Sequence, residues 1–361
     1  MKSESIDISH LQVFVPYPVV GVISPWNYPL ILSFLDAVPA LLAGCSVIIK
    51  PSEVTPRFIE AVNQVLSDTV ELGAVVDVVP GTASTGNNLI DLVDAINFTG
   101  SVETGRQVAT RAANQLKPAF LELGGKDPAI VLKSADIERA AQAILHCATV
   151  NTGQACFSIE RVYVHEALAT KFIDLISSLA EEISLNTEDP AKGAIGPIIS
   201  AKQIQVIDLH LKDARNKKAS FLTGGIIEHH GGSWLRPTVV TDVDHSMLLM
   251  RKETFAPIIP IMTFRKTSEA VFLANESEYG LSAAVFGDMD KSEAVALKLD
   301  AGGIYCNDVD LIGSAHESAE KMSFKNSGLG GSRYGPEGIT RFTRKQSVVF
   351  QHGSGVTIDD L

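Results

Sequence analysis

Short apolar, β-branched runs alternate with helix-like segments along the first third of the chain, and this alternation constrains the fold more than any other feature. Strands are predicted at residues 19–24, 46–50, 75–79, 95–98 and 119–123, and helices at residues 56–72 and 105–114, with a further helix ending at Gly44. Because parallel strands need long crossover connections, the pattern predicts an α/β fold with a parallel sheet. Ligands of such sheets bind beyond the carboxyl ends of the strands, so polar motifs that follow a strand are the first functional candidates.

The rest of the chain repeats the alternation and predicts a second α/β domain. Helices are predicted at residues 137–149 and 167–183, and strands at residues 160–165, 259–264, 283–286 and 303–306. With 361 residues, the chain is too long for one small core. Two short apolar segments, residues 13–15 and 347–350, are predicted to form a small sheet outside both domains.

Charge and cysteine usage exclude several classes of protein. A formal net charge of −12 argues against a nucleic-acid surface. No apolar run is long enough for a membrane span, and the polar start has no signal-peptide pattern. Cys45, Cys147, Cys156 and Cys306 contain no CxxC pair, so the sequence predicts no metal site and no disulfide framework. We expect a reducing, cytoplasmic location and one reactive thiolate.

Cys156 and Glu122 are the candidates for nucleophile and base. Cys156 ends the segment NTGQAC after a predicted helix, where a loop could expose it; the alternative is a small buried apolar residue. Glu122 begins the segment ELGGK at a strand end. Apolar surroundings would raise the pKa of this carboxylate and make it a general base; the alternative is a solvated charge.

Asn27 is the candidate oxyanion donor. It lies in SPWNYP, where two prolines fix the loop. Its amide could stabilise an oxyanion together with the backbone N–H of Cys156, although it could instead satisfy turn backbone groups.

Three further segments are candidates for cofactor binding. GSVETG, which includes Gly100, Ser101 and Gly105, follows a strand and opens a helix, as a pyrophosphate site requires, but it departs from GxGxxG and could be an ordinary turn. Lys50 and Glu53 follow another strand and could bind ribose hydroxyls or form a surface pair. Glu253 and Phe255 lie two residues apart, so on an extended segment they would face one side.

The order and spacing of these motifs resemble the aldehyde dehydrogenase superfamily over residues 13–350. GQxC with Arg161 resembles its nucleophile motif, ELGGK its general-base motif and PWN its oxyanion loop. The segments KPSE, FTGS and ExF resemble its cofactor contacts, and the resemblance adds Trp26 and Leu123 to that group. Asn307 resembles a late asparagine with a structural role.

The resemblance implies a Rossmann-like cofactor domain (residues 19–126), a catalytic domain (127–345) and a small oligomerisation element (1–18 and 346–361). Relatives carry a longer N-terminal segment, so the cofactor domain is expected to be incomplete at its N-terminus.

The implied function is oxidation of an aldehyde to a carboxylic acid with NAD(P)+ through a cysteine thioester, in a homodimer or homotetramer. Glu53 favours NAD, because its charge would repel a 2′-phosphate, while NADP stays possible. The alternatives are a coenzyme A-acylating relative and a catalytically impaired fragment. Tyr28, Leu35 and Phe157 are expected to line an apolar substrate tunnel.

Three local features depart from the family pattern. Asp36 stands where many members have a lysine near the site. Ala256 replaces a glycine, and Met322-Ser323 replace a pair of glycines.

Overall fold

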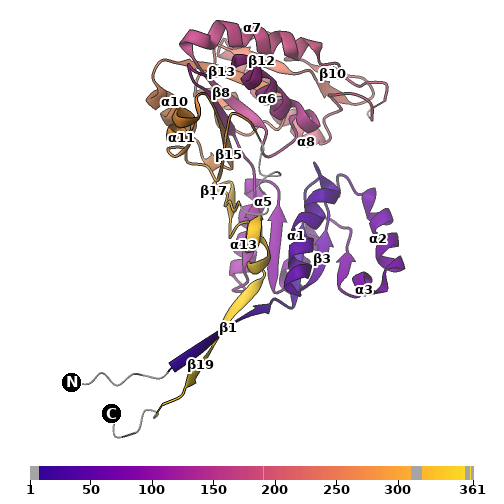
Figure 1. The fold of residues 1–361 in the computed structure, drawn as a ribbon. Coiled ribbons are helices and arrows are strands. Elements are labelled where there is room, and N and C mark those ends of the chain that lie inside the picture. Colours follow the sequence, from indigo (N-terminus) through magenta and orange to yellow (C-terminus); the bar gives the residue numbers. More distant parts are fainter. Residues whose placement is uncertain (1–7, 190, 310–318, 354–357, 359–361) are drawn as a thin grey trace, which may run out of the picture.

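The computed structural model describes residues 8–189, 191–309, 319–353 and 358. These residues form two α/β lobes and a thin two-stranded ribbon that extends away from them (Figure 1). Each lobe is built around one largely parallel sheet, so the α/β class predicted from the alternation is confirmed.

The first sheet contains the strands predicted in the first third of the chain. Its spatial order is β18 (Gly328–Leu329), β6 (Ala119–Glu122), β5 (Ala95–Thr99), β2 (Val19–Ile23), β3 (Ser46–Lys50) and β4 (Val76–Val78). Only β18 is antiparallel to its neighbour among the described strands of this sheet. The order reverses between β2 and β5, and this switch point is where an open α/β sheet leaves a crevice for a ligand.

Helices connect the strands of the first sheet. They are α1 (Pro29–Ala43), α2 (Phe58–Asp68), α3 (Val70–Gly73), α4 (Ala83–Leu92) and α5 (Val102–Ala113). Gly44 ends α1 in the left-handed conformation (φ 98°), as predicted. The helix predicted at residues 56–72 is broken at Thr69, whose φ and ψ of −120° and 87° are not helical. The helix predicted to start at Gly105 begins at Val102, because Ser101 caps it.

The second sheet forms the other lobe. Its spatial order is β16 (Gly303–Cys306), β15 (Ser282–Phe286), β7 (Asp127–Val131), β8 (Ile159–His165), β13 (Ile258–Phe264), β12 (Thr238–Thr241) and β9 (Ser220–Phe221). The remaining elements of this lobe are α6 (Ile137–Thr149), η1 (Val150–Gly153), α7 (Glu166–Glu182), α8 (Ala201–Asn216), α9 (Leu248–Arg251), α10 (Thr267–Asn275), α11 (Met289–Ala296), the hairpin β10 (Ile227–His229)–β11 (Ser233–Leu235), and the pair β14 (Tyr279–Gly280)–β17 (Phe324–Lys325).

The chain passes between the lobes twice. It leaves the first sheet at Glu122 and enters the second at Asp127, so the ELGGK segment is itself the link. It returns through β17, after which β18 pairs with β6 and α13 (Gly335–Thr340) packs on α1. The returning segment therefore lies on the first sheet, although it falls within the range predicted for the catalytic domain.

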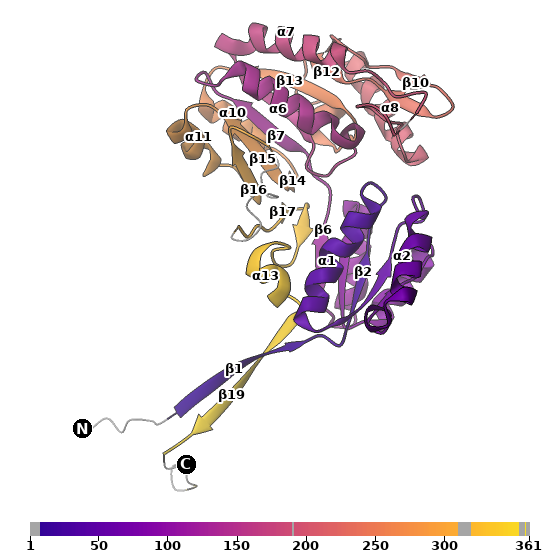
Figure 2. The ribbon, with the colours of Figure 1, turned by 45° about the vertical axis from the view of Figure 1, so that its right-hand side comes forward.

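The ribbon is β1 (Ile8–Pro16) paired antiparallel with β19 (Thr343–Gln351). This pairing confirms the small sheet predicted outside both lobes, and both views show it projecting from the first lobe (Figures 1 and 2). Residues 1–7, 354–357 and 359–361 of the predicted oligomerisation element lie outside the described residues. Among the described helices, none is long and apolar enough to cross a membrane.

Candidate active site

The cleft between the lobes gathers residues from both. It is lined by the predicted nucleophile, base and oxyanion donor and by most of the predicted cofactor residues: Cys156, Glu122, Asn27, Trp26, Gly100, Ser101, Leu123, Glu253 and Phe255. The strand ends explain this convergence. Asn27 follows β2, Gly100 follows β5 and Glu122 ends β6, and these parallel strands carry their carboxyl ends to one edge of the sheet.

Cys156 is held in the cleft by a strained loop. Asn151, Thr152 and Gly153 have successive positive φ angles of 49°, 60° and 67°. A Cβ on Gly153 would lie 2.4 Å from the Ala256 carbonyl carbon, so this loop packs on the Glu253–Phe255 segment in a way that only glycine permits. Strain of this kind is typical of functional sites, because the surrounding packing must hold it.

The thiol of Cys156 is not pre-activated in the free protein. Burial raises its pKa to about 12, which outweighs the lowering effect of Lys321 and Arg333. Burial therefore favours the thiol form of Cys156. Glu122 lines the same cleft as the Cys156 thiol.

Asn27 is fixed against the nucleophile loop. Its side-chain nitrogen donates to the Gln154 carbonyl oxygen at 3.0 Å, while Asn151 Nδ2 donates to the Asn27 carbonyl oxygen at 3.0 Å. An amide nitrogen carries two hydrogens, so Asn27 keeps one for an oxygen near Cys156. The arrangement suits an oxyanion donor whose position is set by its own acceptor contact.

Glu122 is held by a contact that the sequence did not predict. Ser323, which lies just before β17, donates from Oγ to Glu122 Oε2 at 2.8 Å. The two residues are 201 positions apart, and no local pattern links them.

A second buried network links the base motif to the Glu253–Phe255 segment. Lys126 and Glu160 form an ion pair of 2.5 Å, with both side chains nearly inaccessible to solvent. The Glu160 carboxylate also accepts hydrogen bonds from the backbone N–H groups of Thr254 and Phe255, each at 2.7 Å. Glu160 therefore sets the conformation of a segment that includes Phe255, which has a φ of 56°. No motif or spacing in the sequence indicated this role.

Glu253 lies over the glycines of ELGGK. Its Oε1 accepts from the Gly125 N–H at 2.9 Å, and a Cβ on Gly124 would lie 2.6 Å from Oε2. Burial, reinforced by the nearby Glu160 carboxylate, raises the pKa of Glu253 to about 8. Trp26 packs edge-on against Phe255, with ring centroids 5.5 Å apart.

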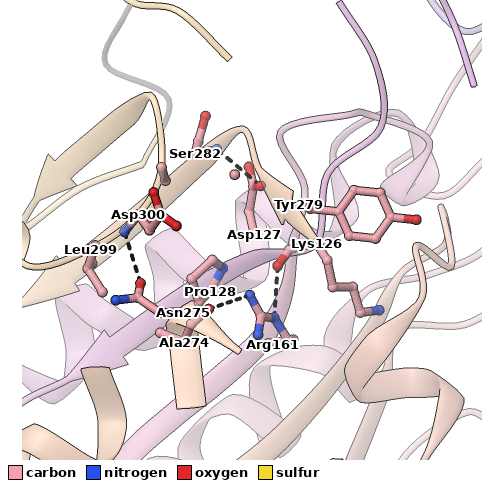
Figure 3. Close-up of a pocket in the computed structure, with 13 residues that line it drawn as sticks. Lys126, Asp127, Pro128, Arg161, Ala274, Asn275, Tyr279, Ser282, Leu299 and Asp300 are labelled. Atoms are coloured by element: carbon pink, nitrogen blue, oxygen red, sulfur yellow. Dashed lines mark hydrogen bonds between the residues drawn. The ribbon is translucent and has the colours of Figure 1, made fainter. Parts of the chain in front are cut away.

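The segment after Lys126 is buried behind the cleft. Asp127 Oδ1 accepts from the Ser282 N–H at 3.1 Å, while Oδ2 has no hydrogen-bond partner among the described residues. Burial holds the pKa of Asp127 well above its ordinary value. In Figure 3 the Asp127 carboxylate faces Ser282, while the Lys126 side chain points away from it. Arg161 donates to the Lys126 and Ala274 carbonyl oxygens, a structural role.

A connected cavity on the first lobe can hold an extended ligand. It is lined by Trp26, Lys50, Glu53, Gly100 and Ser101, among others. Ser101 caps α5 by accepting a hydrogen bond from the Thr104 N–H, and Gly100, Ser101 and Thr104 place the start of α5 in the lining of the cavity. Lys50 Nζ and Glu53 Oε2 form an ion pair of 2.9 Å. This set of donors and acceptors fits a dinucleotide.

Gly105 lies behind that cavity rather than in its lining. A Cβ there would approach Leu123 Cδ2 to 2.5 Å, so this glycine allows α5 to pack closely on the end of β6. Its effect on a ligand would be indirect, through the position of Leu123.

Asp36, which departs from the family pattern, has a structural role in this chain. Asp36 is buried between two arginines: Arg333 donates to it at 3.0 and 2.8 Å, and Arg341 at 2.6 Å. Burial alone would raise the pKa of Asp36, but the two guanidinium groups hold it below its ordinary value. Arg333 also donates to Thr99, which lines the cleft. Asn307 accepts a hydrogen bond from the Gly287 N–H and donates one to the Gly287 carbonyl oxygen, which agrees with its predicted structural role.

None of the three residues predicted to line a tunnel is in the lining of the cleft, although Tyr28 and Phe157 follow the lining residues Asn27 and Cys156 in the sequence. Tyr28 and Phe157 stack with ring centroids 6.5 Å apart, and Leu35 is half-buried on α1. Among the described residues, no group of three His, Cys, Asp or Glu side chains could hold a metal ion.

Comparison with known proteins agrees with this geometry. Residues 3–348 match the model of the aldehyde dehydrogenase family. The chain is 41% identical over 337 residues to a 4,4'-diapolycopene aldehyde oxidase of a Methylomonas species, covering 91% of this chain and 61% of that protein. It is 37% identical to a Mycolicibacterium smegmatis protein whose name refers to succinate-semialdehyde dehydrogenase [NADP(+)], covering 92% and 65% of the two chains. The chain therefore spans less than two thirds of these relatives' length.

Solved structures give the same result. The structure of PutA from Anabaena variabilis superposes with a TM-score of 0.94 at 50% identity, covering 99% of this chain and 76% of that one. The NAD+ complex of the aldehyde dehydrogenase from Bacillus cereus superposes with a TM-score of 0.90 at 31% identity, covering 97% and 71%.

Proposed function

Because this chain belongs to the aldehyde dehydrogenase family, we propose that it oxidises an aldehyde to a carboxylic acid with NAD(P)+ through a thioester on Cys156. The observation that carries the proposal is the convergence of Cys156, Glu122 and Asn27 on one cleft that also contains Glu253 and Phe255. The roles of lobes and ribbon as cofactor, catalytic and oligomerisation units belong to the same proposal.

The chemistry follows from the residues around the sulfur. Cys156 gives up its proton to solvent water, and its sulfur adds to the aldehyde carbon. The Asn27 amide and the Cys156 N–H stabilise the alkoxide. Bound NAD(P)+ supplies the hydride acceptor. Glu122 then takes a proton from a water molecule that attacks the resulting thioester, and the sulfur leaves.

The cofactor is held by residues of the first lobe and the Glu253–Phe255 segment. The first turn of α5 would receive the pyrophosphate, Lys50 and Glu53 the adenosine ribose, and Glu253 and Phe255 the nicotinamide ribose and ring. The Glu53 charge favours NAD, although its pairing with Lys50 leaves NADP possible. The name of one relative refers to NADP(+), which supports a proposal that includes both NAD and NADP as cofactors.

Glu122 supports hydrolysis over transfer to coenzyme A. Glu122 lines the same cleft as Cys156, where it can activate a water molecule for attack on the thioester. An enzyme that transfers the acyl group to coenzyme A does not need a base for water. The stacked Tyr28 and Phe157 beside the cleft support an apolar aldehyde as substrate. The cysteines carry thiols rather than disulfides, which suits a reducing, cytoplasmic location.

The test is turnover by the purified chain. Wild type is expected to form NADH from NAD+ with apolar aldehydes, C156A to form none, and E122Q to give at most one burst per active site. Acid in place of an acyl thioester in the presence of coenzyme A would support hydrolysis. Absence of NADH and NADPH with every aldehyde, from a folded protein, would contradict the proposal.

A further inference from the structure

The hydrogen bond from Ser323 to Glu122 has no part in the reaction steps of the proposed function. We propose that Ser323 is a positioning residue that orients the Glu122 carboxylate for thioester hydrolysis, an inference that rests on that function. Ser323 Oγ donates to Oε2 at 2.8 Å, and no described residue donates to Oε1. The hydroxyl therefore fixes one oxygen and leaves the other to accept the proton.

The backbone around Ser323 is shaped to bring its hydroxyl to the base. Gly328 is the register partner of Glu122. A Cβ on Gly328 would lie 2.6 Å from Ser323 Cβ, so the absence of a side chain there makes room for the serine. On the preceding residue, the Met322 carbonyl oxygen would lie 1.6 Å from a Cβ on Gly302. Close packing of Gly328 on Ser323 and of Gly302 on Met322 therefore fixes the position of Ser323.

The charged groups near Glu122 do not orient its carboxylate. Arg333 donates to Thr99, which is paired with Glu122 across β5 and β6, and Arg341 shares Asp36 with Arg333. The Cys156 thiol and the Glu253 carboxyl line the same cleft as Glu122. A nearby guanidinium attracts both carboxylate oxygens, whereas a hydroxyl hydrogen bond selects one of them.

The step that Ser323 serves is the hydrolysis of the acyl enzyme. The water oxygen forms a bond to the thioester carbon while its proton moves to Glu122 Oε1. The C–S bond then breaks, the carboxylic acid leaves, and Cys156 is released as a thiolate. Acylation and hydride loss do not need the water, so Ser323 should matter after NADH has formed.

The experiment separates the two halves of the reaction. S323A, S323T, E122Q and M322A are compared with wild type in rapid-mixing experiments with NAD+ and an aldehyde. The burst reports acylation, and the steady-state release of acid reports hydrolysis, each measured against pH. M322A is the matched control, because Met322 is the adjacent residue and its side chain is exposed.

We expect S323A to keep the burst rate and to hydrolyse the acyl enzyme about tenfold more slowly, as loss of a hydrogen bond to a charged group predicts. S323T should restore the hydrolysis rate, and M322A should match wild type. An S323A variant with the wild-type hydrolysis rate would overturn the proposal, as would an equal loss in the burst.

A second readout does not depend on turnover. The infrared difference between wild type and E122Q isolates the carboxyl band of Glu122, and the frequency of this band should differ between S323A and wild type because the hydrogen bond from Ser323 is lost. An unshifted band would overturn the proposed hydrogen bond. A shifted band in a chain that releases no acid would instead contradict the hydrolytic function, so the two failures are distinguishable.

Discussion

At the scale of single residues, burial determines the protonation states in the cleft. Cys156 is driven toward the thiol, and Glu253 and Asp127 toward the carboxylic acid, because each loses solvation without a cation in direct contact. Glu160 differs in its contacts, since it is bonded to Lys126 and to two backbone N–H groups.

Cofactor affinity should depend on pH through Glu253. Its pKa of about 8 means that it is protonated below pH 8 and ionised above it. An ionised carboxylate accepts ribose hydroxyl hydrogen bonds more strongly. The dissociation constant for NAD+, measured by calorimetry from about pH 7 to about pH 9, should fall as the pH rises, and E253Q should lose this dependence. The same pH dependence in E253Q would show that another group titrates.

Asp127 should make the folded protein less stable as the pH rises. Its pKa is raised in the folded state, so between the unfolded and folded pKa values the native protein binds the extra proton. Stability is full below the unfolded pKa near 3.8 and decreases as the pH rises through the folded pKa. D127N should be about as stable as wild type at acidic pH and more stable at about pH 8 in urea titrations. Parallel pH curves for the two proteins would contradict the assignment.

At the scale of elements, the site depends on two segments pressed together. The η1 turn immediately precedes the segment that holds Cys156, the proposed nucleophile, and residues 253–257 include the proposed cofactor contacts Glu253 and Phe255. They meet where Gly153 approaches the backbone of Ala256 and Pro257. Neither segment is regular structure, so their mutual packing and the Glu160 anchor have to hold both conformations.

G153A should separate these segments. The new Cβ would need to occupy a position 2.4 Å from the Ala256 carbonyl carbon, at a φ of 67° that non-glycine residues rarely adopt. We expect a loss of about 1–3 kcal/mol in the free energy of unfolding and a larger loss of activity. Urea titration and the NADH burst would measure these effects. G231A is the control, since Gly231 also has a positive φ but no atom within 4 Å of its added Cβ.

At the scale of the whole molecule, the ribbon is the part with least contact to the rest. β1 and β19 extend from the first lobe with both faces largely exposed (Figure 2). Their apolar side chains remain in solvent, including Leu11 at 53%, Val349 at 62% and Phe350 at 44% exposure. A two-stranded ribbon is marginally stable by itself, which supports the proposal that a second copy of the chain packs on it.

Charges on the ribbon should therefore reduce the oligomeric state. L11D and V349D introduce a carboxylate on each strand, away from the cleft. Wild type is expected to be a dimer or tetramer by light scattering after size-exclusion chromatography, and the double variant a smaller species. A wild-type monomer, or an assembly that survives both substitutions, would contradict this interface.

The sequence by itself determined the α/β class, most of the strands and the residues at the strand ends. Hydrophobic period, turn residues and motif spacing are local properties, so the chain order alone was enough to assign Asn27, Gly100 and Glu122 to the ends of strands. Contacts between distant segments had no such signal. Ser323 reaches Glu122 across 201 positions, Arg333 reaches Asp36 across 297, and Glu160 holds Thr254 across 94. The raised pKa of Cys156 likewise follows from burial by both lobes, a quantity that exists only once the chain has folded.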